Sequence, residues 1–133
     1  MKREAKIIRY NEDKSIAICV DVKNATEILS YLGQSDKHKK KFRHICNLIF
    51  NRLKNRDLYD KEEINSKSKG VTAMKFFKGQ SNDRIYCREL TLKDKTFVVI
   101  TSELFEKKKS QKVKGKNRNI IEKVGSYEYE ISE

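Results

Sequence analysis

The segment from Val71 to Phe105, VTAMKFFKGQSNDRIYCRELTLKDKTFVVITSELF, decides the fold. Three runs rich in β-branched and aromatic residues, at 71–77, 84–90 and 95–104, are separated by short polar segments. Segments of that length join antiparallel neighbours, and the unbroken apolar run from Val98 to Ile100 predicts that the last strand is central. We therefore expect a three-stranded antiparallel sheet over residues 71–104.

Residues 1–65 precede this sheet and predict a β-hairpin followed by two helices. Short β-type runs at 5–10 and 15–22 form the hairpin, which ends at residue 23. Asn24 and Glu27 have capping-box spacing, so a first helix is expected at 25–32 with Gly33 as its stop. Ser35 is expected to cap a second helix, whose apolar positions recur at three- and four-residue steps: Phe42, Ile45, Cys46, Ile49, Phe50 and Leu53.

The chain after Phe105 predicts a basic loop and then a C-terminal helix. Apolar residues recur at helical spacing between residues 117 and 129, with an interruption at Gly125. The expected class is thus α+β in a single domain over 1–133. Its parts are a β-hairpin (1–23), a helical pair (24–65), a three-stranded antiparallel sheet (71–104), and a basic loop with a C-terminal helix (105–133). The polar face of the sheet is the expected RNA site.

The charge of the chain points to a polyanionic partner. Among 133 residues, 31 are Lys or Arg and 19 are Asp or Glu, which gives a net charge of +12. The first 33 residues carry +1, residues 34–70 carry +6 and residues 71–133 carry +5. Such a charge destabilises the compact state by self-repulsion, so a polyphosphate partner, above all RNA, is the economical explanation. A generally lysine-rich surface is the alternative interpretation.

Other features of composition narrow the class. The cysteines, Cys19, Cys46 and Cys87, are odd in number and lie among apolar neighbours, which indicates buried thiols. His38 and His44 do not have zinc-ligand spacing, so no metal site is expected. Because no stretch approaches the length of a membrane span and no leader is recognisable, we expect a cytoplasmic protein without membrane contact.

Two basic groups of residues are candidates for contact with RNA. Alternation along 84–90 predicts that Arg84, Tyr86 and Arg88 share one face of the sheet, as a phosphate- and base-binding row or as a solvated face with salt bridges. Residues 107–118 contain seven basic side chains and no acid, which is typical of a loop that follows a nucleic-acid backbone or only solvates itself.

The run from Met74 to Ile131 resembles the RelE/HigB superfamily of toxins, in particular its phage-type branch. The resemblance lies in the strand 83–88 with its arginine and aromatic residue, the hydrophobic strand 97–100, the lysine motif 108–112, and the acidic, tyrosine-bearing tail 126–130. The helical pair placed before the sheet matches the family's order of elements, so a RelE-like fold is expected. The histidine often found near the end of the hydrophobic strand is replaced here by Thr101-Ser102.

The resemblance implies the toxin component of a type II toxin–antitoxin system. Such a toxin is a metal-independent endoribonuclease that cleaves mRNA on the ribosome by 2′-hydroxyl attack on the adjacent phosphate, without a cofactor, and a cognate antitoxin protein is its partner. The implied catalytic residues are Arg84, Arg88, Lys75 and Tyr129. The expected RNA-binding residues are Lys78, Tyr86, Lys107, Lys108, Lys109, Lys112 and Lys114.

Some of these assignments have competitors. Tyr127 falls on the apolar face of the expected helix and fits the core better than catalysis, whereas Glu103 is a less favoured candidate base.

Two other functions remain open. One is a non-catalytic RNA- or ribosome-binding module, in which the missing histidine marks lost chemistry. The other is a gyrase-inhibiting member of the same superfamily.

Overall fold

Strand β2 (Ile16–Asp21) lies inside the sheet, and every one of its residues is buried. The structure is a computed structural model, and it describes residues 2–107 and 116–133. Ile16, Ile18 and Val20 pack into one core cluster, whereas Ala17 and Cys19 pack into another. Both faces of β2 are apolar, as is typical of a strand inside a covered sheet. It pairs along both edges, antiparallel with β1 (Lys2–Tyr10) and parallel with β6 (Phe97–Phe105).

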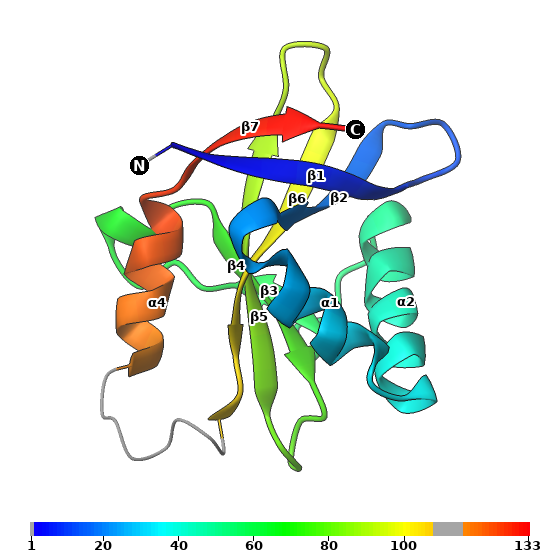
Figure 1. The fold of residues 1–133 in the computed structure, drawn as a ribbon, viewed down its shortest axis with the longest axis vertical. Helices are drawn as coiled ribbons and strands as arrows, with labels where there is room; N and C mark the ends of the chain where they lie inside the picture. Colours follow the sequence, from blue (N-terminus) through cyan, green and yellow to red (C-terminus); the bar gives the residue numbers. More distant parts are fainter. Residues whose placement is uncertain (1, 108–115) are drawn as a thin grey trace.

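The described strands form one mixed sheet of seven strands, in the order β3-β4-β5-β6-β2-β1-β7. The expected antiparallel run is present as β4 (Val71–Phe76), β5 (Asp83–Thr91) and β6. The short strand β3 (Tyr59–Lys61) adds to its outer edge, although this part of the chain was expected to belong to the helical pair (24–65). Figure 1 shows the twist of the sheet, with β1 and β7 running across the direction of β4 and β5. The α+β class is present, but the expected RelE-like arrangement, with a separate hairpin and a three-stranded sheet, is wrong, because β2 joins the hairpin to β6 in one sheet.

The expected C-terminal element is also corrected. Helix α4 (Lys116–Gly125) ends at Gly125, and residues Glu128–Ser132 form strand β7, which pairs in parallel with β1. A Cβ at Gly125 would lie 1.9 Å from the carbonyl oxygen of Lys67, in the short helix η2 (Ser66–Ser68). The helix therefore ends in close contact with η2, and the chain turns back along the sheet.

Helices α1 (Ala25–Gly33) and α2 (Asp36–Phe50) cover one face of the sheet. Ile28, Ile45 and Ile49 pack there against the strands. Ser35 caps α2 as expected, since its side chain accepts a hydrogen bond from the backbone of His38. Asn24, which ends the turn η1 (Val22–Asn24), makes no such bond to α1 and instead donates to the carbonyl of Ser102.

Helix α4 covers the opposite face and thereby removes the open polar face expected for RNA. Ile121 and Val124 pack against Val71, Ala73 and Tyr86 on β4 and β5. Figure 1 shows α4 on the side of the sheet away from α1 and α2. In the middle of β5 both faces are therefore buried, and the α4 face is open only beside α4.

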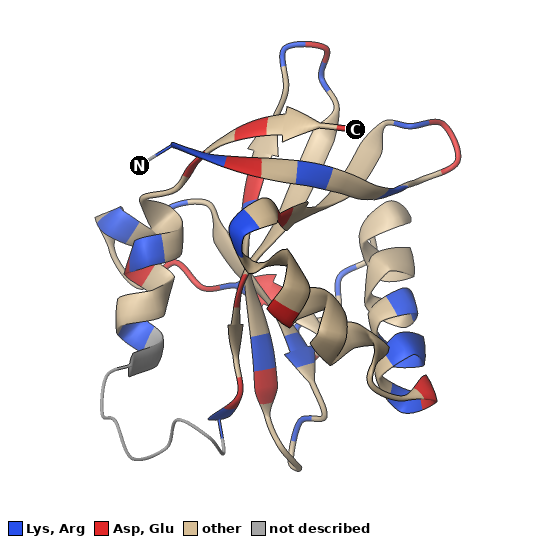
Figure 2. Cartoon of the chain, in the orientation of Figure 1, with Lys and Arg blue, Asp and Glu red and all other residues tan. Residues whose placement is uncertain are grey.

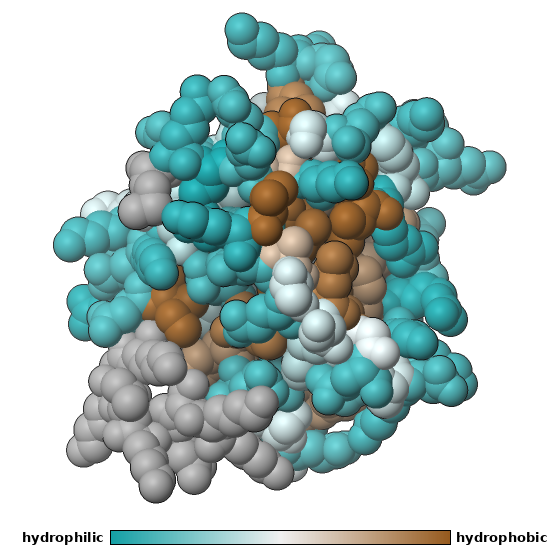
Figure 3. All heavy atoms as spheres, in the orientation of Figure 1, coloured by the Kyte–Doolittle hydropathy of each residue, from teal (hydrophilic) through white to brown (hydrophobic). Residues whose placement is uncertain are grey.

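The face of the molecule drawn in Figure 3 is mostly hydrophilic. Figure 3 shows hydrophobic atoms gathered in a strip around η1 and α1, with hydrophilic side chains on both sides of it.

The three cysteines are buried, and burial raises the pKa of Cys46 to about 11 and that of Cys19 to about 12. Among the described residues, no helix has both the length and the apolar character that a membrane crossing requires.

Candidate functional site

Lys75 and Arg84 stand opposite each other on β4 and β5, near the end of the hairpin that these strands form. Lys75 is two residues from Ala73, and Arg84 is two residues from Tyr86, so both point to the face of the sheet that α4 covers. They lie beyond the part of that face under α4. The Lys75 ammonium donates to the carbonyl oxygen of Arg56 over 2.9 Å. Two of the four implied catalytic residues are thus side by side in the structure.

The partner of Arg84 is Glu62, a residue that the sequence did not single out. The Arg84 Nη1 atom donates to Glu62 Oε1 over 2.6 Å, and 15% of the Glu62 side chain is exposed. The amide of Glu62 donates to the carbonyl oxygen of Val71, which fixes the segment after β3 beside β4. The short, charge-assisted hydrogen bond from Arg84 fixes the orientation of the Glu62 carboxylate.

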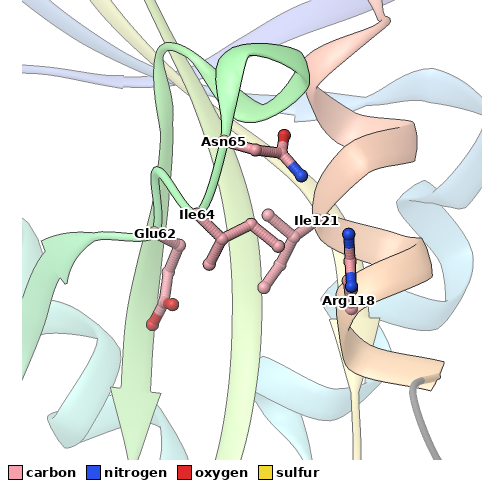
Figure 4. A pocket seen from close by; sticks show the side chains of 5 residues that line it. All are labelled: Glu62, Ile64, Asn65, Arg118 and Ile121. Carbon is pink, nitrogen blue, oxygen red and sulfur yellow. The ribbon is translucent and has the colours of Figure 1, made fainter.

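A cleft of about 430 Å³ opens beside this ion pair, between residues 62–65 and the first turns of α4. Figure 4 shows Ile64 and Ile121 between Glu62 on one wall and Arg118 on the other. Arg118 donates from Nε to Glu122 over 3.0 Å, and Asn65 donates to the same carboxylate oxygen over 3.2 Å. A carboxylate and a guanidinium group therefore face one cleft that also has apolar walls.

A second, smaller hollow lies beside the same ion pair. Its volume is about 100 Å³, and its lining includes Lys75, Lys78, Asn82 and Arg84. Lys78 also pairs with Asp57 over 2.6 Å. The Glu62–Arg84 pair thus lies at the junction of two hollows, one lined by the Glu62 carboxylate and the other by three cations and Asp83. We refer to Lys75, Arg84, Glu62 and the two hollows as the Glu62–Arg84 site.

This site contains the groups that phosphodiester cleavage without a metal requires. A carboxylate can take the proton of an attacking hydroxyl group, and arginine and lysine can stabilise the negative charge that develops on the phosphate. The chain leaves β6 next to it, because Phe105 is the register partner of Arg84. The lysine-rich segment therefore begins beside the site. Lys107 is exposed, whereas Lys108, Lys109, Lys112 and Lys114 fall outside the described residues.

Tyr86 and Arg88 occupy positions that do not suit the roles implied for them. Tyr86 is fully buried under α4, so a base can stack on its ring only if α4 moves. Arg88 is four residues from Arg84, about 13 Å along the strand, and its Nη1 donates to the carbonyl oxygen of Lys69 over 2.6 Å. With α4 between them, Arg84 and Arg88 do not converge on one phosphate.

Tyr129 belongs to a buried polar cluster rather than to the Glu62–Arg84 site. Its hydroxyl group donates to Asp21 over 2.7 Å and contacts the hydroxyl group of Ser102 at 2.8 Å. Arg3 donates twice to the same Asp21 carboxylate, over 2.7 and 3.1 Å. Burial, and then the Asp21 carboxylate, raises the pKa of Tyr129, so this tyrosine remains protonated at neutral pH.

The two competing assignments lie in a neighbouring cluster. Tyr127 is buried, as its place on an apolar face indicated, and its hydroxyl group donates to Glu103 over 2.5 Å. Glu103 also accepts a hydrogen bond from Asn24, at 2.9 Å. The carboxylate of Glu103 thus joins β6 to η1 and to the segment after α4.

A basic groove of about 540 Å³ lies on the other side of the hairpin end, between α2 and Lys78. Lys37, Lys40 and Lys41 line it from α2, and Figure 2 shows basic residues grouped on this helix. The Lys37 ammonium lies 4.7 Å from the centre of the Phe77 ring at the groove. Phe77 has a φ of 56°, an unusual conformation for an aromatic residue. Lys78 lines both this groove and the smaller hollow of the Glu62–Arg84 site.

Comparison with known proteins gives no match: no family model, no curated protein and no solved structure matches the chain.

Proposed function

We propose that this protein is a toxin-type endoribonuclease that cleaves mRNA on the ribosome without a metal ion. The observation that carries the proposal is the contact of Arg84 with Glu62, with Lys75 opposite Arg84 on the neighbouring strand. The resemblance of residues 74–131 to the RelE/HigB superfamily supports it, because Lys75 and Arg84 are among the residues that the resemblance implies. The net charge of +12 supports an RNA substrate.

In the proposed reaction, the 2′-hydroxyl oxygen of the RNA attacks the adjacent phosphorus. Glu62 accepts the hydroxyl proton, and the bond from phosphorus to the 5′-oxygen of the next nucleotide breaks. The products are a 2′,3′-cyclic phosphate and a 5′-hydroxyl end, which takes its proton from water or from a lysine. Arg84 and Lys75 stabilise the charge on the phosphorane. In this scheme Glu62 takes the base role, and Arg88 and Tyr129 have structural roles.

The basic groove and the lysine-rich segment supply the binding surface in this proposal. Lys78 connects the basic groove to the Glu62–Arg84 site, so one RNA chain can contact both. The sequence-independent part of the affinity comes from Lys37, Lys40 and Lys41, and from the lysines of residues 107–114. A cognate antitoxin with an acidic segment would mask this charge in the cytoplasm, where both would act.

The second candidate is a non-catalytic RNA- or ribosome-binding module. The observation that favours it is the engagement of Arg88 with the Lys69 carbonyl and of Tyr129 with Asp21, since two residues implied in catalysis have structural partners. The same basic surface would serve this function.

Cleavage of mRNA on translating ribosomes separates the two functions. The proposal expects metal-independent cleavage that leaves 2′,3′-cyclic phosphate ends. Glu62→Gln and Arg84→Ala should each lower the rate by about 100-fold or more. Lys93→Ala, in the exposed β5–β6 turn, is the control and should cleave at the normal rate. Binding without cleavage by the folded, unsubstituted chain would favour the module, and equal rates for all variants would exclude this site.

A further inference from the structure

A further cavity, of about 380 Å³, lies between the C-terminal end of α2 and the sheet face that carries α1 and α2. Its floor is formed by Tyr59 on β3, Thr72 on β4, Glu89 on β5 and Phe97 on β6. A volume of this size suits a ligand as large as a nucleotide. The cavity is on the face opposite to the Glu62–Arg84 site and takes no part in the proposed cleavage.

A carboxylate with a fixed orientation lies at the floor of this cavity. The Tyr59 hydroxyl group donates to Glu89 Oε2 over 2.5 Å and accepts a hydrogen bond from Thr72 over 2.7 Å. Burial raises the pKa of Tyr59 well above its usual value, so the hydroxyl group stays protonated and remains a donor. The carboxylate has two oxygens with about four lone pairs, and Tyr59 uses one, so Glu89 can accept further hydrogen bonds from a ligand.

One wall of the cavity offers flat groups for stacking. The Arg52 guanidinium lies 6.0 Å from the centre of the Phe97 ring, and both residues line the cavity. Aromatic rings and guanidinium planes are the surfaces on which proteins stack nucleobases. Leu53 is 61% exposed at the same place, which adds an apolar edge.

Arg52 occupies a backbone position that usually contains glycine. The amide of Arg52 donates to the carbonyl of Ile49, and the amide of Leu53 donates to that of Leu48, which is the Schellman ending of a helix. Arg52 has a φ of 54° there, a conformation that favours glycine. The chain thus has a strained arginine where glycine would fit without strain, and its side chain reaches the cavity.

The rim of the cavity is cationic. Lys54, Arg56 and Lys61 are exposed and line it, and Asp60 is the acidic residue among them. A ligand for this cavity therefore has three parts: a planar ring for the wall, hydrogen-bond donors for the floor carboxylate, and an anionic group for the rim.

We propose that this cavity binds a guanine nucleotide, with the base edge on Glu89 and the phosphate at the cationic rim. Guanine is the one common base whose Watson–Crick edge has two adjacent donors, N1–H and the 2-amino group, and these match a carboxylate. The corresponding edge of adenine has an acceptor at N1, which a carboxylate repels. The same chemistry is offered by a free guanine nucleotide and by a guanosine in single-stranded RNA.

Titration of the full chain with GMP and AMP tests the proposal, together with the RNA pentamers UUGUU and UUAUU. We expect the guanine ligand to bind about tenfold more tightly, or better, than its adenine counterpart in at least one pair. Preference in the mononucleotide pair indicates a free nucleotide, and preference in the pentamer pair alone indicates a guanosine in RNA. Equal binding of guanine and adenine ligands in both pairs, or no binding, would overturn the proposal.

Three variants sharpen the test. Glu89→Gln keeps the side-chain shape and an acceptor for Tyr59, and it should remove most of the guanine preference. Arg52→Gly should weaken guanine binding without lowering the melting temperature, because glycine suits that backbone position. Glu12→Gln, in the exposed β1–β2 turn, is the control with the same loss of charge. The Arg84→Ala variant should retain the guanine preference, so that loss of cleavage and loss of this site are separate results.

Discussion

The hydroxyl group of Tyr129 donates to the carboxylate of Asp21 over 2.7 Å, although 108 residues separate the two in the chain. Asp21 ends β2 and has no exposed surface, and Tyr129 lies on β7 at the edge of the sheet. Arg3 on β1, between them in the sheet, binds the same carboxylate. One buried anion therefore connects three strands from both ends of the described chain.

Removing the Tyr129 hydroxyl group should lower stability and leave RNA cleavage unchanged. Tyr129→Phe deletes one hydrogen bond to Asp21 and one to Ser102, so we expect a loss of about 1–3 kcal/mol in the free energy of unfolding, measured with urea. Tyr10→Phe is the control, since the Tyr10 hydroxyl group donates to Glu133 in an exposed hydrogen bond. A cleavage defect in Tyr129→Phe at unchanged stability would instead assign this tyrosine to catalysis.

Replacing Arg88 should lower stability and leave the cleavage rate nearly unchanged, whereas replacing Arg84 should lower the cleavage rate. Arg88→Ala loses the hydrogen bond to the Lys69 carbonyl and the packing against Gly70, so the free energy of unfolding should fall by about 1 kcal/mol. Its cleavage rate on ribosomes should stay within about twofold of normal. Equal cleavage defects in Arg84→Ala and Arg88→Ala would mean that both arginines reach the scissile phosphate after a movement of α4.

Gly125 should not tolerate a side chain. In Gly125→Ala the added Cβ would lie 1.9 Å from the Lys67 carbonyl oxygen, so the backbone of η2 or α4 must shift. We expect a loss of at least about 2 kcal/mol in the free energy of unfolding. In Gly33→Ala the added Cβ meets open space at the end of α1, so this variant should be neutral or slightly stabilising. Similar thermal melts for both variants would contradict the close contact.

The basic groove should contribute to the salt dependence of RNA binding. Replacing Lys37, Lys40 and Lys41 with Gln should reduce the slope of log affinity against log salt by about 2 for single-stranded RNA. The matched control replaces three lysines in the exposed turns at the other end of the sheet: Lys14, Lys93 and Lys95. If both triple variants change the slope equally, the groove has no special role and the protein binds through its net charge.

Stability should fall as the pH rises above about 9. The pKa values of Tyr59, Tyr129 and Cys19 are raised in the folded state, mainly by burial. In the unfolded chain, thiols lose their protons near pH 9 and tyrosines near pH 10, so above these values the folded state binds more protons than the unfolded state. The stabilisation is therefore complete below about pH 9 and is lost in alkali. Urea titrations at pH 8 and pH 10.5 would measure the difference, and a constant free energy of unfolding would refute it.

Local patterns in the sequence predict most helices and strands correctly, but they do not predict which strands pair with one another. The strands at 71–104 and the Ser35 cap followed from alternation and capping chemistry, which depend on residues close in the chain. The parallel pairing of Ile16–Asp21 with β6 could not be predicted in this way, because alternation assigns side chains to faces and does not identify the strand beside them. Residues 128–132 alternate between exposed and half-buried positions, whereas the apolar spacing over 117–129 predicts a helix that includes the first two of them.

The candidate site was predictable only in part, for a similar reason. Lys75 and Arg84 lie on facing strands of one hairpin, so their proximity follows from the strand pattern. Glu62 belongs to a loop, and the signal available was its place in the acidic pair Glu62-Glu63 within a basic region. The burial of Tyr86 depends on where α4 packs, and no residue near Tyr86 in the chain indicates it.

The parallel pairing of β1 with β7 has a consequence for synthesis of the protein. Residues 2–6 pair with residues 128–132, so the first strand to be made completes its hydrogen bonds only when nearly the last described residues have left the ribosome. Contacts of such sequence separation form slowly, because a long loop must close first. Until then, β1 has an unpaired edge, and Asp21 lacks Tyr129. A chain in which β7 has not yet been made therefore exposes a strand edge that can pair with other chains.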